Sequence, residues 1–110
     1  MESRKQSVGK RGEELACQIL KKQGLKIIDR NYYCRFGELD VVCSDQSNQI
    51  VFVEVKTLTA ENFIGIRETL TIRKVQHLHK AIQYWLISKG LQGICSVSYT
   101  HLTLPTNREV

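Results

Sequence analysis

Apolar residues recur at helical spacing in two separate segments of the chain, which predicts two helices. The first runs from Glu13 to Lys22, and the Gly24 that follows is a residue that ends helices readily because it adopts left-handed backbone angles. In the second, apolar positions between residues 75 and 86 recur at intervals of three, four, three and one, and Lys89-Gly90 closes the segment. Each helix is therefore expected to bury one apolar face.

Strand-like segments lie between the two predicted helices. Residues 25–29 form a short candidate, residues 32–36 lead into a second candidate over residues 39–43, and residues 50–56 give the clearest pattern. This last segment is nearly continuously apolar, as a buried central strand is. Because residues 44–49 are a polar turn cluster, the two strands beside it are expected to form an antiparallel hairpin.

Length and composition are those of one small globular domain. The 110 residues are 42% apolar and 25% charged, which is ordinary for a folded protein. No apolar run approaches the ~20 residues that a membrane helix needs, and no signal-peptide pattern begins the chain. We therefore expect a cytoplasmic protein with no membrane partner. Four cysteines without a C-x-x-C pair indicate reduced packing residues.

The net charge of +5 is unevenly distributed along the chain. Residues 1–35 hold nine Lys/Arg against four Asp/Glu, residues 36–66 hold one against five, and residues 67–89 hold five against one. An acidic middle is thus flanked by two basic segments. This pattern suits a site that gathers a cation among carboxylates while the surrounding surface attracts a polyanion. Lysines that only solvate helix faces produce the same counts.

The register of the predicted hairpin brings two carboxylates together. A turn centred near Ser47 places Val42 opposite Phe52 and Asp40 opposite Glu54. Directly opposed residues have Cβ atoms only about 4.5–5.5 Å apart, and like charges there destabilise the sheet unless something compensates them. A bound divalent cation is the expected compensator, with Asp40 and Glu54 as its ligands.

Strand alternation places Glu54 and Lys56 on one face, so Asp40, Glu54 and Lys56 are expected to converge. Carboxylates and the Val55 carbonyl suit Mg²⁺ or Mn²⁺, which retain several waters. The lysine can then orient a water or stabilise a phosphate. Two plainer interpretations remain open: alternating charges on a solvent-exposed strand, and a salt bridge between Lys56 and Asp40. Glu13 only begins the first helix by its periodicity.

Three spaced motifs in a fixed order give the chain a family resemblance. Residues 9–16 (GKRGEELA) are similar to the pattern G-x-x-G-E-x-x-A, residues 31–40 (NYYCRFGELD) to N-Y-R-x-R-x-G-E-I-D, and residues 52–56 (FVEVK) to F-V-E-V-K. The chain resembles the YraN family, uncharacterised protein family 0102, over residues 9–86. That family is similar to archaeal Holliday-junction resolvases within the PD-(D/E)xK nuclease superfamily.

The resemblance implies a restriction-endonuclease-like core, in which a mixed central sheet is flanked by helices in the order αβββαβ. It implies catalytic positions at Glu13, Asp40, Glu54 and Lys56, and metal ligation by Asp40 and Glu54. The expected activity is Mg²⁺- or Mn²⁺-dependent hydrolysis of DNA phosphodiester bonds, with branched or unusual DNA among the substrates. Relatives of this fold that cut both DNA strands tend to act as dimers, so the resemblance also implies a homodimer. The nuclease activity is an argument by analogy.

Basic residues in the flanking segments are the candidate DNA contacts. We expect phosphate contacts from Lys10, Arg11, Arg35, Arg73 and Lys74. Tyr33 and Leu58 stand where the family carries arginine, which predicts weaker phosphate binding in this member.

Aromatic residues offer a second type of nucleic-acid contact, because bases stack on exposed rings. The candidates are Tyr32, Tyr33, Phe36, Tyr84 and Trp85. Trp85 is in phase with the apolar stripe of the second helix and is expected to be buried. His77 and His79 are two residues apart on that helix and so do not face the same way, which argues against a metal pair.

The end of the chain departs from the family pattern. We expect a nuclease-like domain over residues 1–93 and an atypical tail over residues 94–110. Where the family has a final strand of the type R-F-D-V, this chain reads Ile94-Cys95-Ser96-Val97, and residues 98–106 resemble a run found on the ends of unrelated translated sequences. The closing strand is therefore predicted to be lost or replaced, and the tail to be foreign or read-through sequence.

Two other functions compete with the endonuclease. The first is a nucleic-acid-binding module of the same fold with little or no cleavage, and the second is a protein-interaction role in which the carboxylates and Lys56 form a buried polar network. The complete set of four site positions favours the endonuclease over the binding module. Divalent-ion binding separates both of these from the interaction role.

Overall fold

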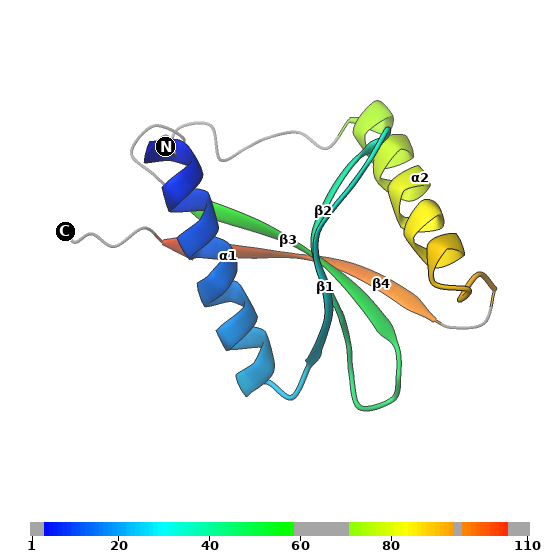
Figure 1. The fold of residues 1–110 in the computed structure, drawn as a ribbon, viewed down its shortest axis with the longest axis horizontal. Helices are drawn as coiled ribbons and strands as arrows, with labels where there is room; N and C mark the ends of the chain where they lie inside the picture. Colours follow the sequence, from blue (N-terminus) through cyan, green and yellow to red (C-terminus); the bar gives the residue numbers. More distant parts are fainter. Residues whose placement is uncertain (1–3, 59–70, 94–95, 106–110) are drawn as a thin grey trace.

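The computed structural model describes residues 4–58, 71–93 and 96–105, and it describes side chains over residues 12–56, 71–93 and 96–104. Helices and strands follow in the order helix, three strands, helix, strand (Figure 1). They are α1 (Arg4–Lys22), β1 (Lys26–Cys34), β2 (Gly37–Ser44), β3 (Ile50–Leu58), α2 (Ile72–Ser88) and β4 (Val97–Pro105). The predicted order αβββαβ is confirmed.

The four strands form one mixed sheet in the order β1-β2-β3-β4. The pairs β1–β2 and β2–β3 are antiparallel, and β3–β4 is parallel. Two parallel neighbours need a crossover connection, and α2 lies in the chain between them. Figure 1 shows α1 and α2 on opposite sides of the sheet. The predicted mixed sheet flanked by helices is therefore confirmed.

Each face of the sheet carries its own hydrophobic cluster. The cluster under α2 consists of Leu39, Val42, Ile50, Phe52, Ala81, Trp85 and Leu86. The cluster under α1 consists of Cys17, Leu20, Val41, Cys43 and Val53. Trp85 is fully buried, as predicted, and its ring meets that of Phe52 edge to face at 5.5 Å. The cysteines described by the structure, at positions 17, 34 and 43, are free thiols.

The helix α1 begins nine residues earlier than the apolar pattern predicts. Its first part, residues 4–12, reads RKQSVGKRG and contains one large apolar residue, so hydrophobic periodicity gives no signal there. Its last turn carries Lys21 and Lys22, where positive charge complements the helix dipole. Within the described ranges, no helix combines the length and the apolar content needed to cross a membrane.

A final strand is present, so of the two outcomes expected for the closing strand, lost or replaced, the first is wrong. Strand β4 pairs with β3 along its whole length, from Ile50 opposite Val97 to Leu58 opposite Pro105. The atypical residues themselves form this strand because enough of them are apolar to serve both faces. Tyr99 packs against the α2 cluster, Leu102 packs against the α1 cluster, and Leu104 is buried.

Candidate active site

The hairpin between β2 and β3 has the predicted register. Val42 lies opposite Phe52, and the pairing runs from Val41 opposite Val53 to Ser44 opposite Ile50. Towards the start of β2, however, the alternation of side chains breaks. Leu39 and Val42 both belong to the α2 cluster although they are three residues apart, a spacing that puts side chains on opposite faces of a regular strand. Asp40 lies within this break.

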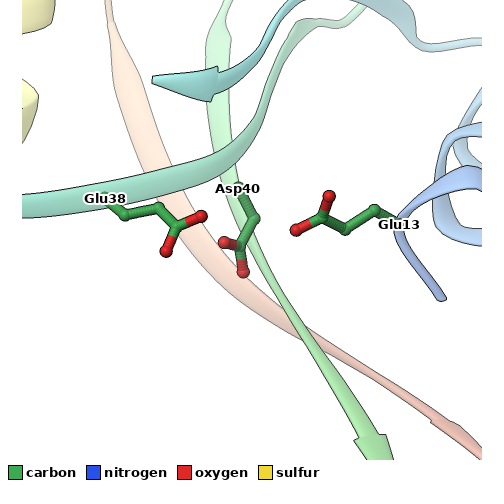
Figure 2. A group of neighbouring side chains, drawn as sticks. All are labelled: Glu13, Glu38 and Asp40. Atoms are coloured by element: carbon green, nitrogen blue, oxygen red, sulfur yellow. The ribbon is translucent and has the colours of Figure 1, made fainter. Parts of the chain in front are cut away.

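The break turns the Asp40 side chain towards the carboxylates of Glu13 and Glu38, which the hairpin register does not predict as its neighbours. Glu13 of α1, Glu38 of β2 and Asp40 can each offer a carboxylate oxygen such that all three lie within 4.8 Å of one another. Figure 2 shows the Asp40 carboxylate between those of Glu38 and Glu13. In addition, Asp40 Oδ2 accepts a hydrogen bond from the Val55 backbone N–H at 2.9 Å, which ties the carboxylate to β3.

The surroundings of Asp40 oppose its negative charge. Its pKa is raised to about 6, first because burial removes the carboxylate from water and then because of the charges of Glu38, Glu13 and Glu54. The Val55 N–H lowers the pKa but does not outweigh burial. At neutral pH the ionised group is therefore held at a free-energy cost that a nearby cation would remove.

Glu13 is held in place by a residue with unusual backbone angles. Asn31 has a positive φ of 53°, a conformation that Asn tolerates better than most residues. With its amide nitrogen turned towards Glu13, Asn31 donates to both carboxylate oxygens at 2.9 and 3.2 Å. Burial and Glu38 raise the pKa of Glu13, while Asn31 and Arg30 lower it. Sequence reasoning assigned no role to Asn31, although it begins the motif of residues 31–40.

Glu38 is the site residue that sequence reasoning missed. It is exposed, and in β2 it lies directly opposite Tyr33 of β1. Its charge, together with hydrogen bonding, raises the pKa of the Tyr33 hydroxyl. The available signal was its spacing, because residues two apart on a strand share a face and Glu38 precedes Asp40 by two.

Glu54 does not join the group formed by Glu13, Glu38 and Asp40. The Tyr99 hydroxyl donates a hydrogen bond to Glu54 Oε1, and His101 Nε2 lies 3.4 Å from the same oxygen. Both partners come from β4, so the strand formed by the atypical tail binds this carboxylate. The β2–β3 pairing ends at Val41 opposite Val53, so Asp40 and Glu54 are not a paired position, although the charge of Glu54 still acts on Asp40.

Lys56 follows Glu54 by two residues on β3, opposite Thr103 of β4, and is half-buried. Of the candidate DNA contacts, Lys10 and Arg11 lie in α1, and Arg35 is exposed in the turn between β1 and β2. Arg73 and Lys74 are exposed in the first turn of α2, where the Thr71 hydroxyl caps the helix by accepting from the Lys74 N–H at 3.1 Å.

The carboxylate group fits a hard divalent cation. Mg²⁺ and Mn²⁺ prefer oxygen ligands, and Mg²⁺ is typically bound through one or two carboxylates with several retained waters. Glu13, Glu38 and Asp40 offer oxygen donors alone, at mutual distances that one ion can bridge. A cation there would also compensate the like charges that raise the Asp40 pKa.

Comparisons with known proteins assign the chain to a family without a known activity. A family model described as "Uncharacterised protein family UPF0102" matches residues 12–102. A UPF0102 protein of Mycobacterium avium (strain 104) is 42% identical over 80 residues, which cover 72% of this chain and 62% of that protein. One from Thermotoga maritima is 38% identical over 94 residues, which cover 86% of this chain and 84% of that protein. The chain thus spans 62% of the mycobacterial relative's length.

Among solved structures, the chain is similar to one titled "crystal structure of a repair endonuclease from Pyrococcus abyssi". The two share 20% sequence identity with a TM-score of 0.48, over 86% of this chain and 38% of that chain.

Proposed function

The chain belongs to the uncharacterised protein family UPF0102, and from that membership and the site geometry we propose that it is a DNA-binding, metal-dependent endonuclease of the restriction-endonuclease-like type. The single observation that carries the proposal is the convergence of Glu13, Glu38 and Asp40, from α1 and β2, to within 4.8 Å. The reaction proposed is hydrolysis of DNA phosphodiester bonds, including those of branched or unusual DNA.

The need for a cation follows from the charges of the group. Three carboxylates at this distance repel one another, and the half-buried Asp40 is already hard to ionise. Glu13, Glu38 and Asp40 would hold Mg²⁺ or Mn²⁺. When bound, such an ion lowers the pKa of a coordinated water and neutralises charge that develops on a phosphate.

The chain's own residues keep the proposed ligands oriented before substrate arrives. The Val55 N–H fixes one oxygen of Asp40, and the Asn31 amide holds both oxygens of Glu13. Ligands held in this way lose little freedom when they bind an ion or a substrate. Lys56 is proposed to act on the phosphate through its ammonium group, as the family resemblance implies.

The position of Glu54 favours a second candidate function, a DNA-binding module with weak or absent cleavage. The resemblance makes Glu54 a metal ligand, yet its carboxylate is bound by Tyr99 and lies near His101. It influences Asp40 through its charge, which contributes to the raised Asp40 pKa. Direct ligation would require Glu54 to leave its partner on β4, and this added requirement is what supports weak or absent cleavage.

Cleavage of a panel of labelled duplex, single-stranded and four-way DNAs tests the two functions. With Mg²⁺ or Mn²⁺ the endonuclease cuts at least one of them, EDTA abolishes cutting, and Asp40→Asn and Glu13→Gln each reduce the rate by a factor on the order of 100 or more. Glu14→Gln is the matched control, because Glu14 is exposed on the same helix and pairs with Arg30 outside the group. DNA binding without any metal-dependent cutting would identify the binding module instead.

A further inference from the structure

An exposed strip of cations and aromatic rings runs along α2 and reaches the turn between β1 and β2. Its α2 members recur at intervals of four, three and four residues, which places them on one side of the helix. The strip, here called the Phe36 surface, consists of Arg35, Phe36, Arg73, His77, Lys80 and Tyr84. Five of these residues are exposed and Phe36 is half-buried.

Phe36 forms the centre of the strip. The Arg35 guanidinium carbon lies 5.2 Å and the Lys80 ammonium nitrogen 5.1 Å from the centroid of its ring, within the range of cation–π contacts. Tyr84 meets the same ring edge to face at 5.1 Å, and His77 approaches it at 6.5 Å. The turn is thereby fixed against α2, with two cations over one ring and a tyrosine that remains 42% exposed.

The charge of the strip is uncompensated within α2. The helix contains Arg73, Lys74 and Lys80 and no Asp or Glu. Two of these cations occupy its first turn, where the helix dipole is already positive and cations are unfavourable. A phosphate backbone supplies negative charge repeatedly and would be attracted to a helix that carries cations and no carboxylates of its own.

The strip ends at the β1–β2 hairpin, whose second strand carries Glu38 and Asp40. Phe36 lies in the turn and precedes Glu38 by two residues in the chain. Tyr33, 69% exposed, lies opposite Glu38 on the neighbouring strand. Figure 1 shows the β1–β2 turn beside the N-terminal part of α2. A DNA strand on the Phe36 surface would therefore extend to the turn from which the strand carrying Glu38 begins.

We propose that the Phe36 surface binds an unpaired stretch of DNA, with a base stacked on Tyr84 and phosphates on Arg35, Lys80 and Arg73. A purely basic patch binds the phosphates of duplex and single-stranded DNA alike. An exposed aromatic ring favours single-stranded DNA, because the bases of a duplex are already stacked on one another. The inference rests on the proposed function in taking DNA as the substrate. It adds the substrate class: DNA with unpaired nucleotides beside the cut site.

Binding of fluorescein-labelled oligo-dT and of a duplex of equal length, measured by anisotropy in EDTA, tests the proposal on the full chain. Tyr84→Leu keeps apolar bulk but removes the π face, and it should weaken oligo-dT binding by roughly tenfold, the loss of about one stacked base. Duplex binding should change less than about twofold. Tyr84→Phe should retain the wild-type affinity for both DNAs, because stacking does not use the hydroxyl.

Charge substitutions separate phosphate contacts from stacking. Lys80→Gln should weaken binding of oligo-dT and duplex alike, while Lys21→Gln, at the far end of α1, should change neither by more than about twofold. The proposal is overturned if Tyr84→Leu, folded by circular dichroism, binds oligo-dT as wild type does. It is also overturned if the affinity of this variant falls equally for oligo-dT and for the duplex. Because EDTA prevents metal-dependent cutting, either result is independent of whether the chain is an endonuclease.

Discussion

At the scale of single residues, the site depends on one irregular position in β2. Regular alternation would place Asp40 beside Glu54 on the α2 face, but the break between Leu39 and Val42 directs it towards Glu13. The neighbouring strand is irregular at the same level, since Asn31 there has a positive φ. Local irregularities of this type are typical of functional sites, where a side chain must leave the pattern of its strand.

Asp40→Asn should stabilise the metal-free protein above pH 6. The folded-state pKa of Asp40 is about 6 against 3.8 for the free side chain, so the folded state binds more protons between these values and loses stability as pH rises through them. Relief of like-charge repulsion on the order of 1 kcal/mol corresponds to a Tm increase of roughly 4–8 °C in a domain of this size. The amide oxygen can still accept from Val55.

Thermal unfolding in EDTA at pH 4 and pH 7.5 checks this expectation. The stabilisation by Asp40→Asn should be present at pH 7.5 and largely lost at pH 4, where the wild-type carboxyl is neutral in the folded state and only about half ionised in the unfolded state. A loss of about 3–5 kcal/mol at pH 7.5 would instead identify Asp40 as half of a buried ion pair with Lys56.

At the scale of elements, the hairpin was predictable and the last strand was not. A polar turn between two apolar strands sets the register through Ser47, and Val42 does lie opposite Phe52. Strand β4 carries serine, threonine and histidine among its apolar residues, so its sequence gives only a weak strand pattern. It forms because the edge of β3 provides backbone hydrogen-bond partners for it. Glu54 could not be placed from sequence because its partners Tyr99 and His101 lie on that strand.

Leu104→Ala tests whether β4 contributes to the fold. Leu104 is 4% exposed near the end of the strand, and removing a buried leucine side chain should lower the free energy of unfolding by about 2–4 kcal/mol. Thr103→Ala is the matched control on the same strand. Because Thr103 is exposed, this substitution should lower the free energy of unfolding by no more than roughly 0.5 kcal/mol. Urea unfolding compares the two variants. Equal, negligible effects would mean that residues 97–105 are not part of the stable sheet.

At the scale of the whole molecule, the structure shows where the acidic and basic segments of the sequence place their charges. The carboxylates that gather at the site come from α1 and β2, while Arg35, Arg73 and Lys74 lie exposed near the β1–β2 turn and the start of α2. Negative charge is thereby concentrated at one point within a chain of net charge +5. Such a distribution attracts a polyanion to the basic surface and a cation to the carboxylate group.

DNA binding should accordingly be strongly salt-dependent. The log–log slope of affinity against salt should amount to several units, and Arg73→Glu with Lys74→Glu should reduce it by about two, since each phosphate contact contributes roughly 0.9. Lys21→Glu with Lys22→Glu is the control: it changes the net charge equally at the last turn of α1. Equal effects of the two pairs would show that net charge alone governs binding, and a flat salt response would exclude DNA as a partner.

Calorimetric titration of Mn²⁺ into the metal-free protein at pH 7.5 tests the central claim, that Glu13, Glu38 and Asp40 form a divalent-cation site. Wild type should bind one ion per chain, Asp40→Asn should bind none, and Lys56→Ala should bind as wild type does because its proposed role is with the phosphate. If wild type binds no Mn²⁺, or if Asp40→Asn binds it with unchanged affinity, the carboxylate group is not a metal site and the proposed hydrolysis loses its basis.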